Sequence, residues 1–300
     1  MHVFRALSLL FALAFTSATA TAQGTGPKIF ISIDMEGLAG VVTDEQLGPE
    51  GFEYQRFRQF MTDELLAAIE GAREAGAGEI LVADSHGNGQ NVLIELLPDD
   101  IQIVRSWPRP LGMMQGIDES FDGVFFIGYH SSTTNTEGVR AHTMSSANIT
   151  DVQLNDISVP EAGINAAIAG HFGVPVILVT GDDAIVDETR TLIGDFEEAV
   201  VKWAVSFHSA RTLTPGAAAE LIREKARAAV SRIDDFEPWR LEGDVAFDLS
   251  LKHYRPVELL GYLRDVERID SHTIRYVGRD ILDVSRFFAF VTGYSISVQP

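Results

Sequence analysis

The stretch Lys28-Ile29-Phe30-Ile31-Ser32-Ile33-Asp34-Met35-Glu36-Gly37 decides the fold, because it joins an uninterrupted apolar run to two carboxylates. The run Ile29 to Ile33 has the length and β-branched content of a strand buried on both faces, which is typical of a mainly parallel sheet. Three further runs of this kind follow along the chain: Ile80 to Ala83, Val124 to Ile127 and Val176 to Val179. The pattern therefore predicts four buried strands.

Helical patterns lie between these runs. From Tyr54 to Ala75, apolar residues recur at steps of three and four, and Gly76 ends the pattern. Pro160 suits the first turn of a second helix, which continues at helical spacing from Ala162 to His171. Because strands and helices alternate, we expect an α/β fold: a three-layer, mainly parallel sheet flanked by helices, with right-handed crossovers.

The last third of the chain has a different pattern. Pro215 to Ile233 predicts a long helix. Three strand patterns and a further helix follow, at Val245 to Leu251, Val266 to Ile269, Thr273 to Val277 and Ile281 to Val291. We therefore predict an α/β metal-binding catalytic domain over residues 23–211 and a smaller C-terminal α+β subdomain over residues 212–300.

The first 22 residues have the features of a signal peptide. Arg5 supplies a positive start, Ala6 to Phe15 is apolar, and Ala20-Thr21-Ala22 forms a small-residue cleavage site. An uncleaved membrane anchor is the alternative, but a spanning helix needs about 20 apolar residues, and this run is shorter. We expect a secreted or periplasmic protein that does not associate with a membrane after cleavage.

The composition excludes several classes of function. Lys and Arg number 23 and Asp and Glu 43, which gives a formal net charge of −20. Phosphate backbones and anionic lipid surfaces repel such a protein, so we expect no nucleic acid partner. There is no cysteine, which excludes disulfides, thiolate metal sites and a cysteine nucleophile. Any metal must therefore be held by oxygen and imidazole nitrogen.

Each predicted strand runs straight into ionisable side chains. The four endings are Asp34-Met35-Glu36-Gly37, Asp84-Ser85-His86-Gly87, Gly128-Tyr129-His130 and Gly181-Asp182-Asp183. A single aspartate after a strand is commonly a turn former or a helix cap. Four such endings in succession are harder to explain that way, because the ligand crevice of an open α/β sheet lies at the carboxyl ends of its strands. We therefore expect these side chains to converge on one edge of the sheet.

These residue types favour a metal site. Imidazole nitrogen and carboxylate oxygen suit zinc, and also manganese or iron. Asp34 and Glu36 are two residues apart and face the same side of an extended strand, so Asp34 can bridge two ions about 3.5 to 4 Å apart. Two such ions form a hydrolytic site, whereas a single ion or a purely structural cluster is the competing interpretation.

Two further residues are ambiguous from the sequence alone. Glu161 follows Pro160 in a first helical turn, where the helix dipole by itself favours a carboxylate. His142 lies in a loop-like stretch, where a histidine is more often a surface residue. The remaining histidines of the mature chain have no acidic companions at metal spacing and are interpreted as structural: His171, His208, His253 and His272.

Several motifs in order resemble the DppA-type D-aminopeptidases, the M55 family of zinc metallopeptidases. They are Ser32-Ile33-Asp34-Met35-Glu36-Gly37, Asp84-Ser85-His86, Gly128-Tyr129-His130, His142-Thr143-Met144, and Asn155-Asp156 through Glu161 to Asn165. The likeness extends through Phe60 to Glu64 and Val179 to Asp183, so it covers about Lys28 to Asp183. It is looser after about Thr212, and a signal peptide is not typical of the family.

The resemblance implies a function and a site. Family members bind two zinc ions per subunit, remove an N-terminal D-amino acid such as D-Ala from short peptides, and assemble as homodecamers. Matching the motifs implies a ligand set, with Asp34 as the bridging carboxylate. It gives His142 the position of the catalytic histidine, as a proton-transfer or a nucleophilic group. The implied metal ligands are Asp34, Glu36, His86, His130 and Glu161. A homo-oligomer acting on short D-amino-acid-containing peptides is the expectation that follows.

Two other functions remain open from the residues. A binuclear-metal phosphoesterase can use the same ligands, but it usually recruits Arg or Lys to clamp the phosphate. Near the proposed ligands the sequence offers Arg140, with Arg105 and Arg109 farther away. A non-catalytic exported solute-binding or metal-binding protein is the second alternative.

Overall fold

The larger part of the molecule is built on a seven-stranded sheet. The computed structural model describes residues 25–295, so the predicted signal peptide at residues 1–22 lies outside the described residues. The strand order is β3-β2-β1-β4-β7-β8-β9, and all neighbours are parallel except β8 and β9. The strands are β1 (Lys28–Ile33), β2 (Glu79–Asp84), β3 (Gln102–Val104), β4 (Gly123–Tyr129), β7 (Val176–Asp182), β8 (Glu197–Ser206) and β9 (Ser209–Thr212).

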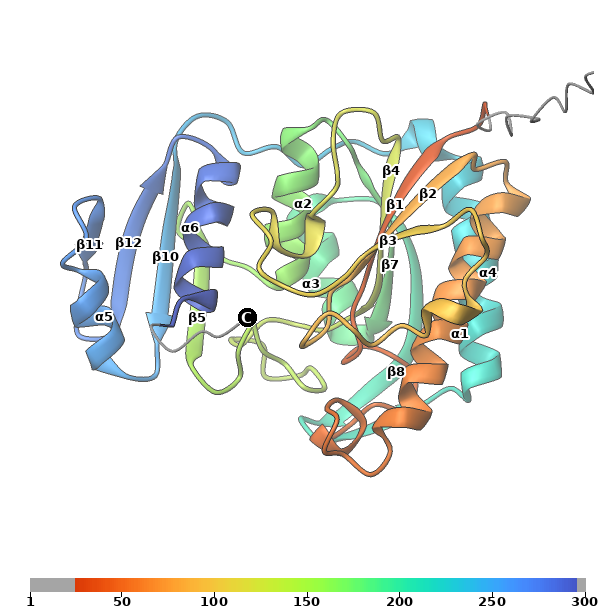
Figure 1. The fold of residues 1–300 in the computed structure, drawn as a ribbon, viewed down its shortest axis with the longest axis horizontal. Helices are drawn as coiled ribbons and strands as arrows, with labels where there is room; N and C mark the ends of the chain where they lie inside the picture. Colours follow the sequence, from red (N-terminus) through yellow and green to blue (C-terminus); the bar gives the residue numbers. More distant parts are fainter. Residues whose placement is uncertain (1–24, 296–300) are drawn as a thin grey trace, which may run out of the picture.

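Helices cover both faces of this sheet, which gives three layers (Figure 1). On one face α1 (Tyr54–Glu74) packs beside α4 (Pro215–Ser231), and on the other α2 (Glu161–His171) packs beside α3 (Asp183–Ile193). The stripe expected on α1 is buried, as Phe57, Met61, Leu65, Ala68 and Ala72 show. Strands β4 and β7 are buried along their whole length, as expected for central strands of a covered parallel sheet. The predicted α/β class is confirmed.

A second, smaller sheet is antiparallel and stands beside the first (Figure 1). Its strand order is β11-β12-β10-β5-β6. The strands are β5 (Ile149–Leu154), β6 (Ile157–Ser158), β10 (Val245–Leu251), β11 (Val266–Arg268) and β12 (Thr273–Gly278), with helices α5 (Tyr254–Leu260) and α6 (Ile281–Gly293). Helix α6 packs on β10 and β12 and also contacts α2, so it joins the second sheet to the first.

The division predicted at residue 212 differs from this arrangement in two places. Strand β5, from the middle of the chain, pairs with β10, with Leu154 opposite Phe247. Helix α4 follows residue 212 but packs on α1 and β8 of the first sheet. Both contacts join residues far apart in the sequence. A short strand pattern or a helical stripe predicts the element itself but not the element on which it packs.

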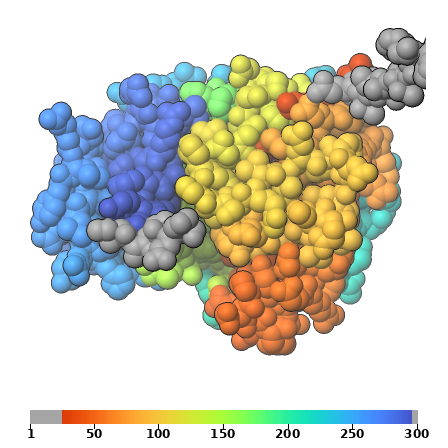
Figure 2. Space-filling model, in the orientation of Figure 1, coloured from red at the N-terminus to blue at the C-terminus, as the bar shows by residue number. Residues whose placement is uncertain are grey.

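In the part of the chain that the structure describes, the remaining regular elements are four 3-10 turns: η1 (Asp44–Gln46), η2 (Ile94–Leu96), η3 (Gly112–Met114) and η4 (Ile233–Asp235). Turn η3 contacts both α2 and α6 and so lies where the two parts of the molecule meet. Figure 2 shows this junction from outside, with the blue C-terminal elements against the yellow segment of the larger part. Within residues 25–295, no helix is long and apolar enough to span a membrane.

Candidate metal centre and active site

The ends of three central strands lie level with one another and carry four of the predicted ligands. Ile33 at the end of β1 is paired with Asp84 of β2 on one side and with Ile127 of β4 on the other. Asp34 and Glu36 follow β1, His86 comes two residues after β2, and His130 directly follows β4. Glu161 enters from α2, where it is the first helical residue. The predicted convergence at the carboxyl edge of the sheet is therefore present.

Two glycines allow the loops after β1 and β4 to touch. Gly37 N–H donates to the Gly128 carbonyl at 2.7 Å, and a Cβ on Gly37 would lie 2.0 Å from the Tyr129 carbonyl oxygen. Gly128 has φ +69°, and a Cβ there would lie 2.4 Å from the Asp34 carbonyl oxygen. A larger residue at either position would push the Asp34 and His130 segments apart.

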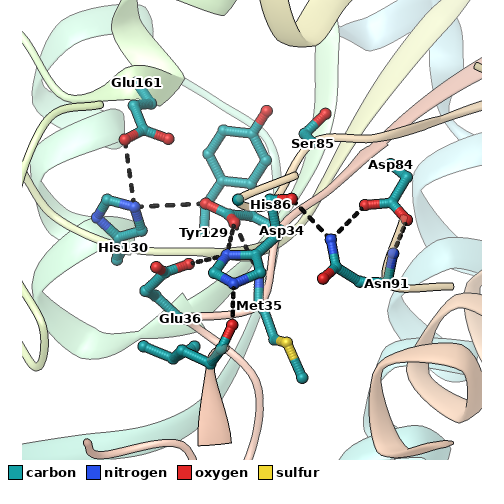
Figure 3. A network of polar contacts seen from close by, with 12 residues as sticks. Asp34, Met35, Glu36, Asp84, Ser85, His86, Asn91, Tyr129, His130 and Glu161 are labelled. Atoms are coloured by element: carbon teal, nitrogen blue, oxygen red, sulfur yellow. Dashed lines mark hydrogen bonds and ion pairs between the residues drawn. The ribbon is translucent and has the colours of Figure 1, made fainter. Parts of the chain in front are cut away.

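Asp34 stands between the two histidines, with one carboxylate oxygen toward each (Figure 3). Its Oδ1 lies 3.2 Å from His86 Nδ1, and its Oδ2 lies 3.3 Å from His130 Nε2. Glu36 Oε2 approaches the same nitrogen of His86 at 2.8 Å, and Glu161 Oε1 approaches His130 Nε2 at 3.4 Å. All five side chains are buried, so three carboxylates and two imidazoles share one enclosed site.

A backbone carbonyl fixes the tautomer of each imidazole at the site. His86 Nε2 lies 2.7 Å from the Leu47 carbonyl, and His130 Nδ1 lies 3.2 Å from the Ser131 carbonyl. Since a carbonyl only accepts hydrogen bonds, those nitrogens carry the protons, and the other nitrogen of each ring points at carboxylate oxygens. A lone pair directed at an anion needs a cation between them, either a proton or a metal ion.

The electrostatics of the site also favour a cation between the imidazoles and the carboxylates. Burial alone would lower the pKa of His86, but the charges of Glu36 and Asp34 raise it well above its usual value. The pKa of His130 is raised well above its usual value in the same way, by Glu161 and Asp34 against the effect of burial. Both shifts have the same physical cause, because the buried carboxylates favour a positive charge at each ring.

His142 lies beside this cluster. Its ring stacks on that of His130, with centroids 4.0 Å apart and planes 4° apart. Its Nδ1 is 2.7 Å from the Arg140 carbonyl, and its Nε2 is 4.0 Å from Glu36 Oε1. The cluster divides into two groups whose ligand atoms lie within 4.8 Å of one another, Asp34–Glu36–His86 and His130–His142–Glu161. His142 is thus placed either as a second-group ligand or as a proton carrier beside it.

The other acids at the strand ends have structural partners. Asp84 accepts hydrogen bonds from the backbone of Asn91 and Val92 and so orders the turn after His86. Asp182 accepts from the backbone of Val139 and of Ile185, which caps α3 and ties down the loop that leads to His142. For these two residues, the interpretation as turn former and helix cap is the one the contacts support.

The ligand cluster opens into a cavity of about 470 Å³ between the two parts of the molecule. Besides the six site residues, its walls come from the Trp107 to Met113 segment, from α2 and from α6, where Phe288 and Thr292 contribute. The sequence did not indicate these walls, because no motif marks a loop or a distant helix as lining a site. Arg109 is on the wall, whereas Arg140, the nearer arginine in the sequence, pairs with Asp44 and His208 instead.

Comparison with known proteins identifies the family. The family model for M55 peptidases, described as D-aminopeptidase, matches residues 28–290. The chain belongs to the M55 family of D-aminopeptidases. A curated M55 relative, the D-aminopeptidase of Bacillus subtilis (strain 168), is 30% identical over 266 residues, which cover 88% of this chain and 96% of the relative.

A solved structure gives the same result for the fold. The Zn-dependent D-aminopeptidase DppA from Bacillus subtilis, described as a self-compartmentalizing protease, matches with a TM-score of 0.86 at 29% identity. The match covers 90% of this chain and 98% of that chain. The M55 match runs well past Thr212, where the sequence motifs suggested only a loose likeness, so the second sheet is part of the family fold. This M55 protein is therefore a hydrolase of the metallopeptidase class.

Proposed function

We propose that the protein is a di-zinc aminopeptidase that removes an N-terminal D-amino acid, such as D-Ala, from short peptides. The observation that carries the proposal is the fixed orientation of His86 and His130, whose free nitrogens face three buried carboxylates. Zinc takes such nitrogen and oxygen ligands, and each ring N–H on a backbone carbonyl is the usual support of a metal-binding histidine. The name of the Bacillus subtilis relative, a Zn-dependent D-aminopeptidase, supports the choice of metal.

The donor set fits two ions. Asp34, Glu36 and His86 would hold one, and Asp34, His130 and Glu161 the other, with Asp34 shared because its two oxygens face opposite histidines. When bound, the zinc pair would polarise the scissile carbonyl and lower the pKa of a water.

His142 is the residue we assign to proton transfer. Its Nδ1–H donates to the Arg140 carbonyl, which leaves Nε2 as the free nitrogen, on the side of Glu36. The ring is the least buried of the three and borders the cavity, so it can reach a substrate. Held in this way, Nε2 can take up a proton during attack on the carbonyl and pass it to the leaving amine.

The size of the cavity favours short substrates. A volume of about 470 Å³ lies in the range of small-molecule sites and holds a peptide of a few residues. Export by the predicted signal peptide would bring the protein to D-amino-acid peptides derived from peptidoglycan. A homo-oligomeric assembly, a homodecamer by family resemblance, is part of the same proposal, and the description of the relative as self-compartmentalizing supports it.

The test is hydrolysis of D-Ala-p-nitroanilide and L-Ala-p-nitroanilide by the purified mature chain, before and after chelation. We expect cleavage of the D-substrate only, its loss on chelation, and its return with zinc. Activity that survives removal of all metal would contradict the proposal. Two bound ions without hydrolysis of any D-peptide would favour a solute-binding or metal-binding protein, and cleavage of a phosphodiester instead would favour a phosphoesterase.

A further inference from the structure

Arg109 is an arginine held rigidly in the wall of the cavity. Its Nε donates to the Ser106 carbonyl at 2.6 Å, and its Nη2 donates to the Asp84 carbonyl at 2.8 Å. The guanidinium also lies over the Trp107 ring, 4.1 Å from its centroid. Trp107 in turn donates from Nε1 to the Gly87 carbonyl at 2.8 Å. Arg109 and Trp107 therefore both fasten onto the β2–His86 turn, close to the metal ligands.

One nitrogen of this guanidinium is not used by the protein. Arg109 is 3% exposed, and its Nη1 has no hydrogen-bond partner among the residues that the structure describes. Leaving a buried charged donor unpaired costs more than leaving a neutral one unpaired. Nε and Nη2 already account for the attachment of the loop, whereas Nη1 is covered but unpaired in a side chain that lines the cavity, so it is the nitrogen left for a ligand once the wall adjusts.

The cavity has a place for each end of a short peptide. The ligand cluster of Asp34, Glu36 and Glu161 would hold the zinc pair and with it the scissile carbonyl of the N-terminal residue. Among the lining residues of the described chain, Arg109 is the only Arg or Lys. Burial lowers its pKa to about 10, so it remains cationic at neutral pH. The Asp84 carboxylate does not compete for Nη1, since its oxygens accept from Asn91 and Val92.

We propose that Arg109 binds the C-terminal α-carboxylate of the substrate and so makes this site selective for di- and tripeptides with a free C-terminus. The inference rests on the proposed aminopeptidase function. A carboxylate is the natural partner of a guanidinium N–H, and such charge-assisted hydrogen bonds are among the strongest in proteins. Apolar residues such as Leu111, Met113 and Phe288 also line the cavity, and no second Arg or Lys does among the residues that the structure describes.

The first arm of the test varies the substrate and leaves the protein intact. The zinc-loaded full chain is assayed on D-Ala-D-Ala and on D-Ala-D-alaninamide, which differ only in the carboxylate. We expect kcat/KM to be about 10- to 100-fold higher for the free acid, mostly through KM. Equal rates for the acid and the amide would overturn the role of Arg109 while leaving the aminopeptidase function in place. Failure to cleave either substrate would instead count against the proposed function.

The second arm assigns the preference to one side chain. Arg109→Met should bring the acid-to-amide ratio close to one, and because the ratio compares two substrates on the same enzyme, a change in the β2–His86 turn that lowers both rates alike leaves it unaffected. Arg105→Met is the matched control, because Arg105 lies four residues earlier, is exposed and does not line the cavity. A folded Arg109→Met enzyme that keeps the full preference for the free acid would overturn the proposal. If that variant does not fold, Arg109→Lys takes its place, because lysine keeps the charge but lacks the planar guanidinium with its several N–H donors. We expect an intermediate acid-to-amide ratio, and a ratio equal to that of the wild type would overturn the proposal.

Discussion

The imidazole rings of His130 and His142 lie parallel, with centroids 4.0 Å apart and planes 4° apart. His130 points its free nitrogen at Asp34 and Glu161, whereas His142 has its free nitrogen on the side of Glu36, at 4.0 Å. Two stacked rings thus have different partners. This difference allows the proposed roles of the two residues, metal binding for His130 and proton transfer for His142, to be tested separately.

Replacing His142 should separate proton transfer from metal binding. We expect His142→Ala to keep two zinc ions and to lose about 10²- to 10⁴-fold in kcat, the usual contribution of a general acid–base group. Zinc content by elemental analysis and turnover of D-Ala-p-nitroanilide are the measurements. His171→Ala, exposed at the end of α2, is the control and should be fully active. Loss of one ion in His142→Ala would move this residue into the ligand set, and full activity would remove it from the mechanism.

Asp34 faces both histidines, whereas Glu161 faces only His130. Replacing Asp34 should therefore remove more zinc than replacing Glu161. Glu161→Gln should lower the zinc content from about two ions toward one, while Asp34→Asn should weaken both sites. Equilibrium dialysis against zinc, followed by elemental analysis, measures the difference. If both variants lost the same single ion, Asp34 would not be a bridge.

Gly128 should tolerate no side chain. Gly128→Ala places a Cβ about 2.4 Å from the Asp34 carbonyl oxygen at a φ of +69°, so we expect a loss of stability of about 2 kcal/mol or more, together with weaker zinc binding. Gly216→Ala is the matched control, since Gly216 lies in α4 with no atom within 4 Å of the added methyl and should be neutral or stabilising. Denaturant unfolding of both variants tests this. A Gly128→Ala protein as stable as the wild type would show that the contact can relax.

The buried carboxyl of Glu64 should make stability depend on pH. Burial raises its pKa to about 7, although the Ala39 N–H and Lys202 oppose the rise. The folded state therefore holds a proton that the unfolded chain has already released, so this contribution is fully present below about pH 4.5 and is lost as the pH rises through 7. The difference amounts to on the order of 3 kcal/mol. Glu64→Gln should flatten the dependence of Tm on pH between 4.5 and 7, and a slope equal to that of the wild type would assign the effect to other groups.

The predicted export can be checked directly on the protein. Expressed from its full sequence, the chain should be recovered outside the cytoplasm with Gln23 as its first residue. N-terminal sequencing or intact-mass measurement decides this. A cytoplasmic product that retains Arg5 would contradict both the signal peptide and the proposed source of substrates.

The sequence could predict the central sheet and the ligand cluster because both depend on local patterns. The apolar run before Asp34 indicates by itself a buried strand of a parallel sheet. Parallel pairing then brings the ends of β1, β2 and β4 together.

Other features depend on contacts between distant parts of the chain. Strand β5 alternates only weakly and gains its place by pairing with β10, about a hundred residues later. Arg109 is a loop residue whose role depends on backbone carbonyls that only the folded turn after β2 presents. His142 showed no local sign of function, and only the likeness to a family marked it. The helical stripe of α4 was visible, but its partner α1 was not.

The cavity wall formed by α6 has a consequence for biosynthesis. All six residues of the cluster lie between positions 34 and 161, yet Phe288 and Thr292 close the cavity from near the end of the chain. During synthesis, the six residues of the cluster are therefore made well before α6, which completes the wall of the cavity. A chain that stops before α6 would lack the wall formed by Phe288 and Thr292, so its ligand cluster would lie in an open groove and not in a chamber.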